Sequence, residues 1–199
     1  TLQETGAEFL LVPNGSPYYR NKFETRLNHM VARVIETDLP LIYLNMVGGQ
    51  DDQVFDGGSF VLNPGGDLAV QLPVFDELTV HVDFEHTSHG WRAASGQKSL
   101  LPSGEEQDYR VCVEALRDYM GKTGFKKVLL GLSGGIDSAL VATIAVDALG
   151  ADNVRCVMLP SEYTSQGSLD DAKDIAERLG VRYDFVPIAK GRAAITETL

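Results

Sequence analysis

The chain has 199 residues, of which 44% are hydrophobic and 23% are charged, and this composition is that of an ordinary globular protein with one large domain or two small ones. Its 28 acidic residues outnumber 17 basic residues, and the resulting formal charge of −11 argues against a nucleic-acid-binding surface. No run approaches the roughly 18 apolar residues of a membrane span. No signal peptide opens the chain, so we expect a cytoplasmic protein without a membrane partner.

The first part of the chain alternates short apolar runs with one amphipathic segment. This pattern predicts, in order, a strand, a helix, a second strand and antiparallel hairpins at 8–12, 21–38, 41–45 and 59–85. The apolar face of the helix is expected to consist of Phe23, Leu27, Met30, Val31, Val34 and Ile35. Gly48 and Gly49 should form a turn after the second strand.

Residues 86–104 are rich in Ser, Gly and Pro and show no sustained periodicity, so they are predicted to form an extended linker between two domains. Trp91 is the exception and should anchor this linker to a domain surface. The two cysteines, Cys112 and Cys156, are expected to be small buried hydrophobic residues, because neither has the spacing of a metal ligand.

After the linker, helices alternate with apolar strands. The predicted elements are helices at about 105–123, 137–149 and 168–179 and strands at 127–132, 154–160 and 181–186. Such alternation indicates a parallel sheet, whose ligands bind at the carboxyl ends of the strands. We therefore expect segments 133–138 and 158–161 to border one nucleotide cleft.

The segment Ser133-Gly134-Gly135-Ile136-Asp137-Ser138 lies between a predicted strand and a predicted helix and has the chemistry of an anion site. Its two glycines allow a positive φ and a close backbone approach, and the first N–H groups of the helix point outward at the positive end of the helix dipole. Ser133 and Ser138 can add hydroxyl donors, and Asp137 can hold Mg²⁺ on a pyrophosphate leaving group. An ordinary strand-to-helix turn is the alternative interpretation.

Two other phosphate-binding loops are missing from the sequence. A Walker loop needs G-x-x-x-x-G-K-[ST], but Leu116 stands where the first glycine should precede Gly121-Lys122-Thr123. No G-x-G-x-x-G follows a predicted strand, which excludes a dinucleotide-binding Rossmann fingerprint.

Segment 133–138 resembles the PP-loop of the ATP pyrophosphatases, whose signature is Ser-Gly-Gly-x-Asp-Ser. The resemblance implies a protein that splits ATP between its α and β phosphates and adenylylates a substrate, with Mg²⁺ held by Asp137. Leu159-Pro160-Ser161-Glu162-Tyr163-Thr164-Ser165 is similar to the family segment Met-Pro-Ser-x-Tyr-Ser-Ser, which borders the adenine. The ATP-binding residues implied by these matches are Gly131, Leu132, Ser133, Gly134, Gly135, Ile136, Asp137, Ser138, Leu159 and Ser161.

Three stretches of the first part resemble a nitrilase-type glutamine amidotransferase domain, and more narrowly the amidase part of the glutamine-dependent NAD synthetases. They are V-P-N-G-S-P-Y-Y-R-N-K at 12–22, F-D-G-G-S at 55–59 and N-P-G-G at 63–66. The resemblance implies that Ser16 and Lys22 contact glutamine. No residue of this chain is assigned to the Glu-Lys-Cys triad of that family, which is expected upstream of Thr1.

Together these observations predict an α/β fold class in two parts. A partial nitrilase-like α-β sandwich is expected at 1–85 and a linker at 86–104. A parallel-sheet α/β domain of the adenine-nucleotide-hydrolase-like (PP-loop) type should follow at 105–199, as the beginning of a synthetase domain.

The resemblance implies ATP-dependent amidation of deamido-NAD to NAD with glutamine-derived ammonia, through an adenylylated intermediate and with release of AMP and pyrophosphate. A PP-loop module that only binds an adenine nucleotide, or an enzyme that amidates another acceptor, is the alternative. The expected partners are deamido-NAD, glutamine and ATP, in a homo-oligomer that binds no nucleic acid. This segment alone is expected to be inactive.

Overall fold

The structure, a computed structural model, describes residues 3–198, so the predicted domain bounds at residues 1 and 199 lie outside the described residues. The chain divides into two compact units, Thr1–Ala115 and Leu116–Leu199. Over the range 3–198, no helix combines the length and the apolar character that a membrane crossing requires.

The first unit is built from short strands and one helix of its own. Its elements are η1 (Gln3–Thr5), β1 (Leu10–Asn14), α1 (Lys22–Thr37), β2 (Leu41–Asn45), β3 (Val47–Gln50), β4 (Gln53–Asp56), β5 (Phe60–Leu62), β6 (Leu68–Gln71), β7 (Phe84–Thr87) and β8 (Gly90–Ala93). The helix α2 (Gly104–Thr123) begins in this unit and ends in the second. The two strands, the helix and a hairpin predicted for this part are therefore confirmed, with bounds that shift by a few residues.

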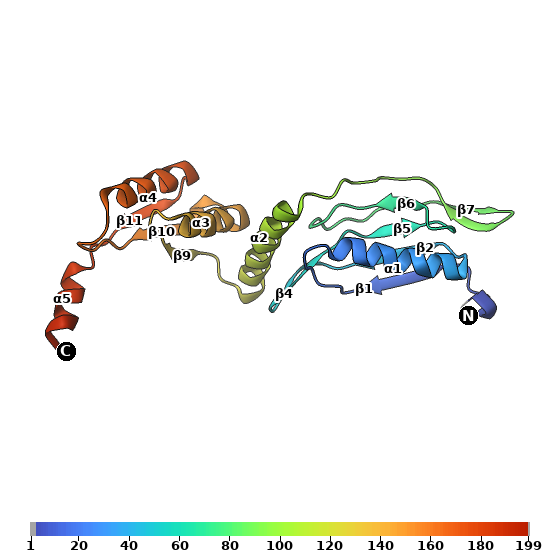
Figure 1. Ribbon diagram of the computed structural model, residues 1–199, viewed down its shortest axis with the longest axis horizontal. Coiled ribbons are helices and arrows are strands. Elements are labelled where there is room, and N and C mark those ends of the chain that lie inside the picture. Colours follow the sequence, from blue (N-terminus) through green and yellow to red (C-terminus); the bar gives the residue numbers. More distant parts are fainter. Residues whose placement is uncertain (1–2, 199) are drawn as a thin grey trace. The chain divides into compact units, whose positions relative to one another are not determined.

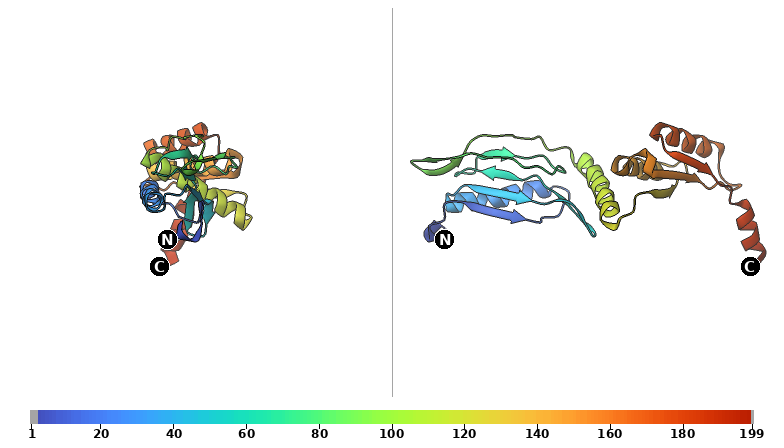
Figure 2. Two further views of the ribbon diagram at one scale, coloured as in Figure 1. Left: turned by 90° about the vertical axis from the view of Figure 1, so that its right-hand side faces the viewer. Right: turned by 180° about the vertical axis from the view of Figure 1, so that it is seen from behind.

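Strands β1, β2, β5 and β6 form one sheet in that order, and α1 lies against it (Figures 1 and 2). β1 and β2 run parallel with α1 as their connection, and their carboxyl ends are in register at Asn14 and Asn45. The core between helix and sheet contains Leu10, Val34, Leu39, Leu41, Tyr43, Phe60 and Leu62. Ile35, which was expected on the buried face, is 64% exposed, because the residue after the buried Val34 is rotated by about 100° around the helix axis.

β3 and β4 form a separate antiparallel hairpin, and the turn predicted at Gly48 and Gly49 is wrong. Both glycines lie within β3, where Gly48 pairs with Phe55 and Gly49 pairs with Val54. The chain reverses just afterwards at Asp51, whose φ of 54° lies in the left-handed region that Asp tolerates better than most residues. The glycines therefore lie in the strand, and Asp51 forms the turn.

A second hairpin, of β7 and β8, lies inside the segment predicted to be an extended linker. The ring of Trp91 in β8 lies 5.5 Å from the ring of Phe9 and 5.0 Å from that of His86, so Trp91 anchors this segment to the first unit as expected. Strands of four residues are too short for their alternation to stand out from a loop, which explains why the hairpin was missed. The division into two domains and a linker stays a prediction.

The second unit alternates strands and helices. After α2 come β9 (Val128–Gly131), α3 (Ile136–Leu149), η2 (Ala151–Asn153), β10 (Val154–Met158), α4 (Gln166–Leu179), β11 (Arg182–Phe185) and α5 (Ala189–Thr198). The strands form a parallel sheet in the order β11-β10-β9, as predicted. Cys156 is buried in this core as expected, whereas Cys112 is exposed, because its neighbour Val113 takes the buried position on α2.

Candidate functional site

The loop between β9 and α3 depends on a glycine that has no room for a side chain. Gly134 has a φ of 82°, in the left-handed region that favours glycine. A Cβ placed on it would lie 2.3 Å from the backbone oxygen of Ser168 in α4. Gly135, which precedes α3, has a φ of −85°, so only the first of the two glycines uses the positive φ that both allow. Gly134 therefore lets the loop approach the start of α4.

Two serine hydroxyls tie the ends of this loop together. The Ser138 hydroxyl lies 3.1 Å from that of Ser133, accepts the Ser133 N–H at 3.2 Å and donates to the Gly135 oxygen at 3.0 Å. The Ala139 N–H also donates to the Gly135 oxygen, at 3.1 Å, and begins the hydrogen bonds of α3. The N–H groups of residues 136–138 are thus those that a helix leaves without an internal acceptor, at the positive end of its dipole. This end of α3 can accept an anion.

A cleft of about 490 Å³ opens at the carboxyl ends of β9 and β10. The Leu132 N–H donates to the Val157 oxygen at 2.9 Å and so holds the two strand ends together. The cleft brings together four of the predicted ATP-binding residues, Gly131, Leu132, Ser133 and Leu159. Among the described residues that line it, the other predicted ones do not occur, namely Gly134, Gly135, Ile136, Asp137, Ser138 and Ser161.

Ser161 shapes the loop after β10. Its N–H donates to the Thr164 hydroxyl at 3.0 Å, and its own hydroxyl accepts the Tyr163 N–H at 3.3 Å. Ser165 then caps α4 by accepting the Ser168 N–H at 3.1 Å. Four residues of this loop and of the start of α4 line the cleft, although the sequence did not predict them as site residues: Tyr163, Thr164, Ser165 and Ser168. A hydroxyl residue directly before a helix was the available signal, because N-caps favour Ser and Thr.

Asp137 is the one carboxylate in the loop at 133–138, and it is exposed in the first turn of α3. Across residues 3–198, no three His, Cys, Asp or Glu side chains are placed together so that they could hold a metal ion. An ion at Asp137 would therefore take its other ligands from phosphate oxygens and water, which is how Mg²⁺ is usually held in nucleotide sites. The single carboxylate fits that mode of binding.

Of the two residues predicted to contact glutamine, Ser16 lies on the connection between β1 and α1 and Lys22 begins α1. Ser16 is only 9% exposed, and its hydroxyl accepts the Nε–H of Arg26 at 3.0 Å. Lys22, the first residue of α1, is half-buried, and its Nζ lies 3.2 Å from the Tyr19 hydroxyl and 4.2 Å from the centre of the Tyr19 ring. The Ser16 hydroxyl is therefore fixed by the guanidinium group of Arg26, and the ammonium group of Lys22 lies against the Tyr19 ring.

The same loop is bonded to α2 within the first unit. The Tyr18 hydroxyl donates to one carboxylate oxygen of Asp108 at 2.7 Å, and Arg20 pairs with the other. Burial, followed by the hydrogen bond to Asp108 and the charge of that carboxylate, raises the pKa of Tyr18 from 10.0 to about 12. Hydrogen bonds from Arg20 and then Tyr18 lower the pKa of Asp108. The segment between Ser16 and Lys22 is thereby fixed at its middle.

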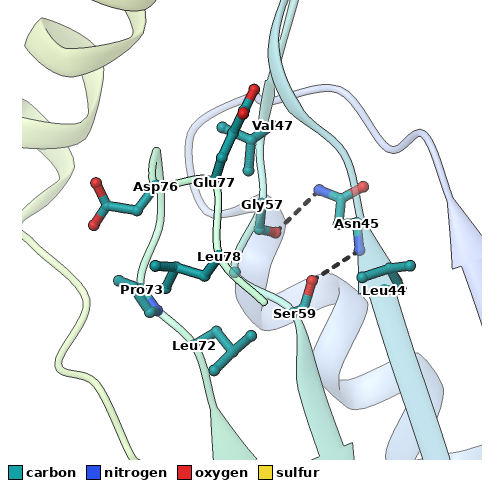
Figure 3. A pocket seen from close by; sticks show the side chains of 11 residues that line it. Leu44, Asn45, Val47, Gly57, Ser59, Leu72, Pro73, Asp76, Glu77 and Leu78 are labelled. Carbon is teal, nitrogen blue, oxygen red and sulfur yellow. Dashed lines mark hydrogen bonds between the residues drawn. The ribbon is translucent and has the colours of Figure 1, made fainter. Parts of the chain in front are cut away.

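A second cavity, of about 280 Å³, lies beside the carboxyl end of β2 (Figure 3). The backbone N–H of Asn45 donates to the Ser59 hydroxyl at 3.0 Å, and its side-chain Nδ2 donates to the Gly57 oxygen at 3.1 Å. Asp76 and Glu77 also line the cavity. The sequence did not predict it, because its walls come from segments that are far apart along the chain.

Both parts of the chain match known families. Residues 1–91 match the carbon-nitrogen hydrolase family, and residues 108–199 match the NAD synthase family. The chain is 63% identical over its full length to a glutamine-dependent NAD(+) synthetase of Rhodobacter capsulatus, and 42% identical over 94% of its length to one of Acinetobacter baylyi. It aligns over its full length, with 39% identity and a TM-score of 0.93, with a structure of the glutamine-dependent NAD+ synthetase of Acinetobacter baumannii in complex with adenosine diphosphate.

The chain matches a segment of the glutamine-dependent NAD synthetases. It spans 36% of the Rhodobacter relative, 34% of the Acinetobacter baylyi relative and 37% of the Acinetobacter baumannii chain. The predicted resemblance to this family is confirmed. The predicted fold class, a partial nitrilase-like part followed by an α/β synthetase part, is confirmed as well.

The raised pKa of Tyr18 predicts how this contact responds to pH. Because the phenol holds its proton more tightly in the folded state, the stability it contributes is complete below pH 10 and is lost as the pH rises from about 10 to about 12. The difference in phenolate absorbance between the wild type and Tyr18→Phe should have its midpoint near pH 12. Asp108→Asn should lower that midpoint, and Glu106→Gln, which removes another carboxylate of α2, should leave it unchanged. A wild-type midpoint at 10 would contradict the contact.

The close approach of Gly134 to α4 predicts that an added methyl group is harmful there. Gly134→Ala should lower the free energy of unfolding of the second unit by about 2 kcal/mol or more, because it combines a left-handed backbone with a collision against Ser168. Gly131→Ala is the matched control, since a Cβ at Gly131 meets nothing within 4 Å. Urea denaturation of both variants measures the difference. Equal stabilities would show that the loop does not need this approach.

Proposed function

We propose that the protein to which this segment belongs amidates deamido-NAD to NAD, with ATP as co-substrate and glutamine as the source of ammonia. The observation that carries the proposal is the Ser-Gly-Gly-x-Asp-Ser loop at the carboxyl end of β9, beside a cleft between two parallel strands. The relationship to glutamine-dependent NAD synthetases over the whole chain supports it. The predicted cytoplasmic location and homo-oligomeric state stay predictions.

A carboxylate reacts poorly with ammonia until one of its oxygens belongs to a good leaving group. In the proposed reaction the nicotinate carboxylate attacks the α-phosphorus of ATP and pyrophosphate leaves, after which ammonia displaces AMP to give the amide. The loop at 133–138 would stabilise the departing pyrophosphate through the N–H groups at the start of α3 and the hydroxyls of Ser133 and Ser138. We assign the residues that bind deamido-NAD to parts of the protein beyond this segment.

The cleft would hold the adenosine part of ATP. Its volume lies within the usual range for small-molecule sites, and Leu159 supplies an apolar wall after β10. Ser161 would contribute by holding the loop 161–164 in shape through its two hydrogen bonds. Gly131 and Leu132 would border the opposite side, at the end of β9.

Asp137 is the residue that would hold Mg²⁺, since it is the carboxylate of the loop and stands exposed at the start of α3. When bound, the ion would supply positive charge to the pyrophosphate, which the loop itself lacks because it contains neither Lys nor Arg. Asp137 would also orient the phosphate chain relative to the helix N–H groups.

Ser16 and Lys22 would bind glutamine in the amidase part. We place the division between the parts at 1–85, 86–104 and 105–199, and we place the Glu-Lys-Cys triad upstream of this segment. The proximity of Lys22 to Tyr19 supports a role in binding an anion, because the ring orients the ammonium group without pairing it with a carboxylate.

Product analysis of the intact parent protein tests the proposal. With deamido-NAD, ATP and glutamine, chromatography should show NAD, AMP and pyrophosphate. ADP and phosphate would exclude pyrophosphate chemistry at this loop. Binding of ATP without any turnover would favour a nucleotide-binding module, and turnover of a different carboxylate alone would favour another acceptor.

Asp137→Ala in the intact protein should lower the rate of pyrophosphate release by about 100-fold or more, because the charge that stabilises the leaving group is lost. The fold should survive, since Asp137 is exposed. Asp171→Ala, which removes an exposed carboxylate of α4, is the matched control and should leave the rate unchanged. An unchanged rate in Asp137→Ala would remove this residue from the proposed magnesium site.

Lys22→Ala in the intact protein should weaken NAD synthesis from glutamine and spare synthesis from free ammonium, because only the first uses the amidase site. Lys98→Ala, which removes the other lysine of the first unit, should affect neither. The two nitrogen donors are compared at saturating ATP. A parallel loss of both activities in Lys22→Ala would show that Lys22 supports the fold instead of glutamine binding.

A further inference from the structure

A buried ion pair lies directly behind Ser16. Arg26 of α1 is 4% exposed and Asp56 of β4 is 1% exposed. Their contact is bidentate, with Nη1 donating to one carboxylate oxygen at 2.9 Å and Nη2 donating to the other at 2.7 Å. A buried ion pair is stable only where further hydrogen bonds satisfy the donors and acceptors that the two charged groups do not use on each other.

The remaining donors of Arg26 reach the loop after β1. Its Nε–H donates to the Ser16 hydroxyl at 3.0 Å, and Nη2 also donates to the backbone oxygens of Ser16 at 2.7 Å and Pro17 at 3.2 Å. The guanidinium thus uses one edge to bind the carboxylate and the other to bind the loop. A lysine could not make both sets of bonds, because it lacks this planar arrangement of donors.

Asn45, at the end of β2, holds Ser16 from the other side. Its Oδ1 accepts the Ser16 N–H at 2.8 Å, and its Nδ2 donates to the Ser16 oxygen at 3.2 Å and to Asp56 at 3.4 Å. Every polar atom of Ser16 is therefore bonded to a side chain from another element. A serine that merely formed a turn would not require two such partners, Arg26 and Asn45.

The bond from Arg26 determines what the Ser16 hydroxyl can do. Because its oxygen accepts the Nε–H, its own proton is directed elsewhere, and the group is presented as a donor. A donor hydroxyl suits an oxygen of a carboxylate or an amide. Arg26 itself is neutralised by Asp56, so it acts on a ligand through Ser16.

We infer that Arg26 is a positioning residue for glutamine recognition, which fixes Ser16 so that its hydroxyl donates to the substrate. This inference rests on the proposed function in one respect, namely that Ser16 contacts glutamine. Asp56 holds Arg26 in place, and Asn45 holds the Ser16 backbone in place.

A double-mutant cycle on the intact parent protein tests the inference, with glutamate release from glutamine as the readout. Ser16→Ala and Arg26→Met should each raise the KM for glutamine by about tenfold, the size expected for one hydrogen bond to a charged group. The kcat should change by less than about threefold. Arg26→Met in the Ser16→Ala background should add nothing further, because the two residues act as one unit. Arg33→Met, which removes an exposed cation of the same helix, should leave both parameters unchanged.

Arg26→Lys covers the case in which Arg26→Met leaves the buried Asp56 carboxylate without a cation and the protein does not fold. It retains the charge beside Asp56, loses the Nε–H to Ser16, and should still raise the KM. Additive effects of Ser16→Ala and Arg26→Met or Arg26→Lys would overturn the inference. So would a fall in kcat and in the melting temperature with an unchanged KM. Absence of glutamine hydrolysis in the wild type would overturn it together with the glutamine site. Hydrolysis without amidation of deamido-NAD would refute only the proposed function, and the KM values would still decide on Arg26.

Discussion

Parallel pairing of two strands determines where both loops of interest are placed. In the first unit β1 and β2 end side by side at Asn14 and Asn45, and in the second unit Gly131 of β9 pairs with Val157 of β10. The chain must leave each pair at the same edge of the sheet, so the two loops that follow start next to one another. In each unit a hydrogen bond then ties the first loop to the neighbouring strand, from Ser16 to Asn45 of β2 and from Leu132 to Val157 of β10.

The loop after β9 and the loop after β1 are stabilised by different interactions. The loop at 133–138 in the second unit contains no Lys or Arg, and the hydroxyls of Ser133 and Ser138 join its two ends. Its shape depends on sterics, because Gly134 permits contact with α4. The loop of the first unit is held by charge, with Arg26 paired to Asp56 in the interior. Breaking such a pair by removal of one partner typically costs about 3–5 kcal/mol, because the other charge is left buried without compensation.

The sequence predicted the parts that depend on local pattern. The strand, loop and helix around segment 133–138 follow from periodicity and from two glycines, and the parallel sheet follows from the alternation of elements. The β3–β4 hairpin could not be predicted, because its glycines lie in a strand and an aspartate takes the turn. The partners of Ser16 were equally out of reach, since Asn45 is 29 residues away and no periodicity relates the two.

Among the charged residues between Ser16 and Arg26, one cation has no carboxylate partner. Between residues 16 and 26 the chain carries Arg20, Lys22 and Arg26. Arg26 is neutralised by Asp56 and Arg20 by Asp108, so neither has a full charge to offer. Lys22 is held by the ring and hydroxyl of Tyr19, which orient the ammonium group without neutralising it. A carboxylate that entered this loop would therefore be attracted to Lys22. The ion pairs of Arg20 and Arg26 hold the loop that carries Lys22 in place.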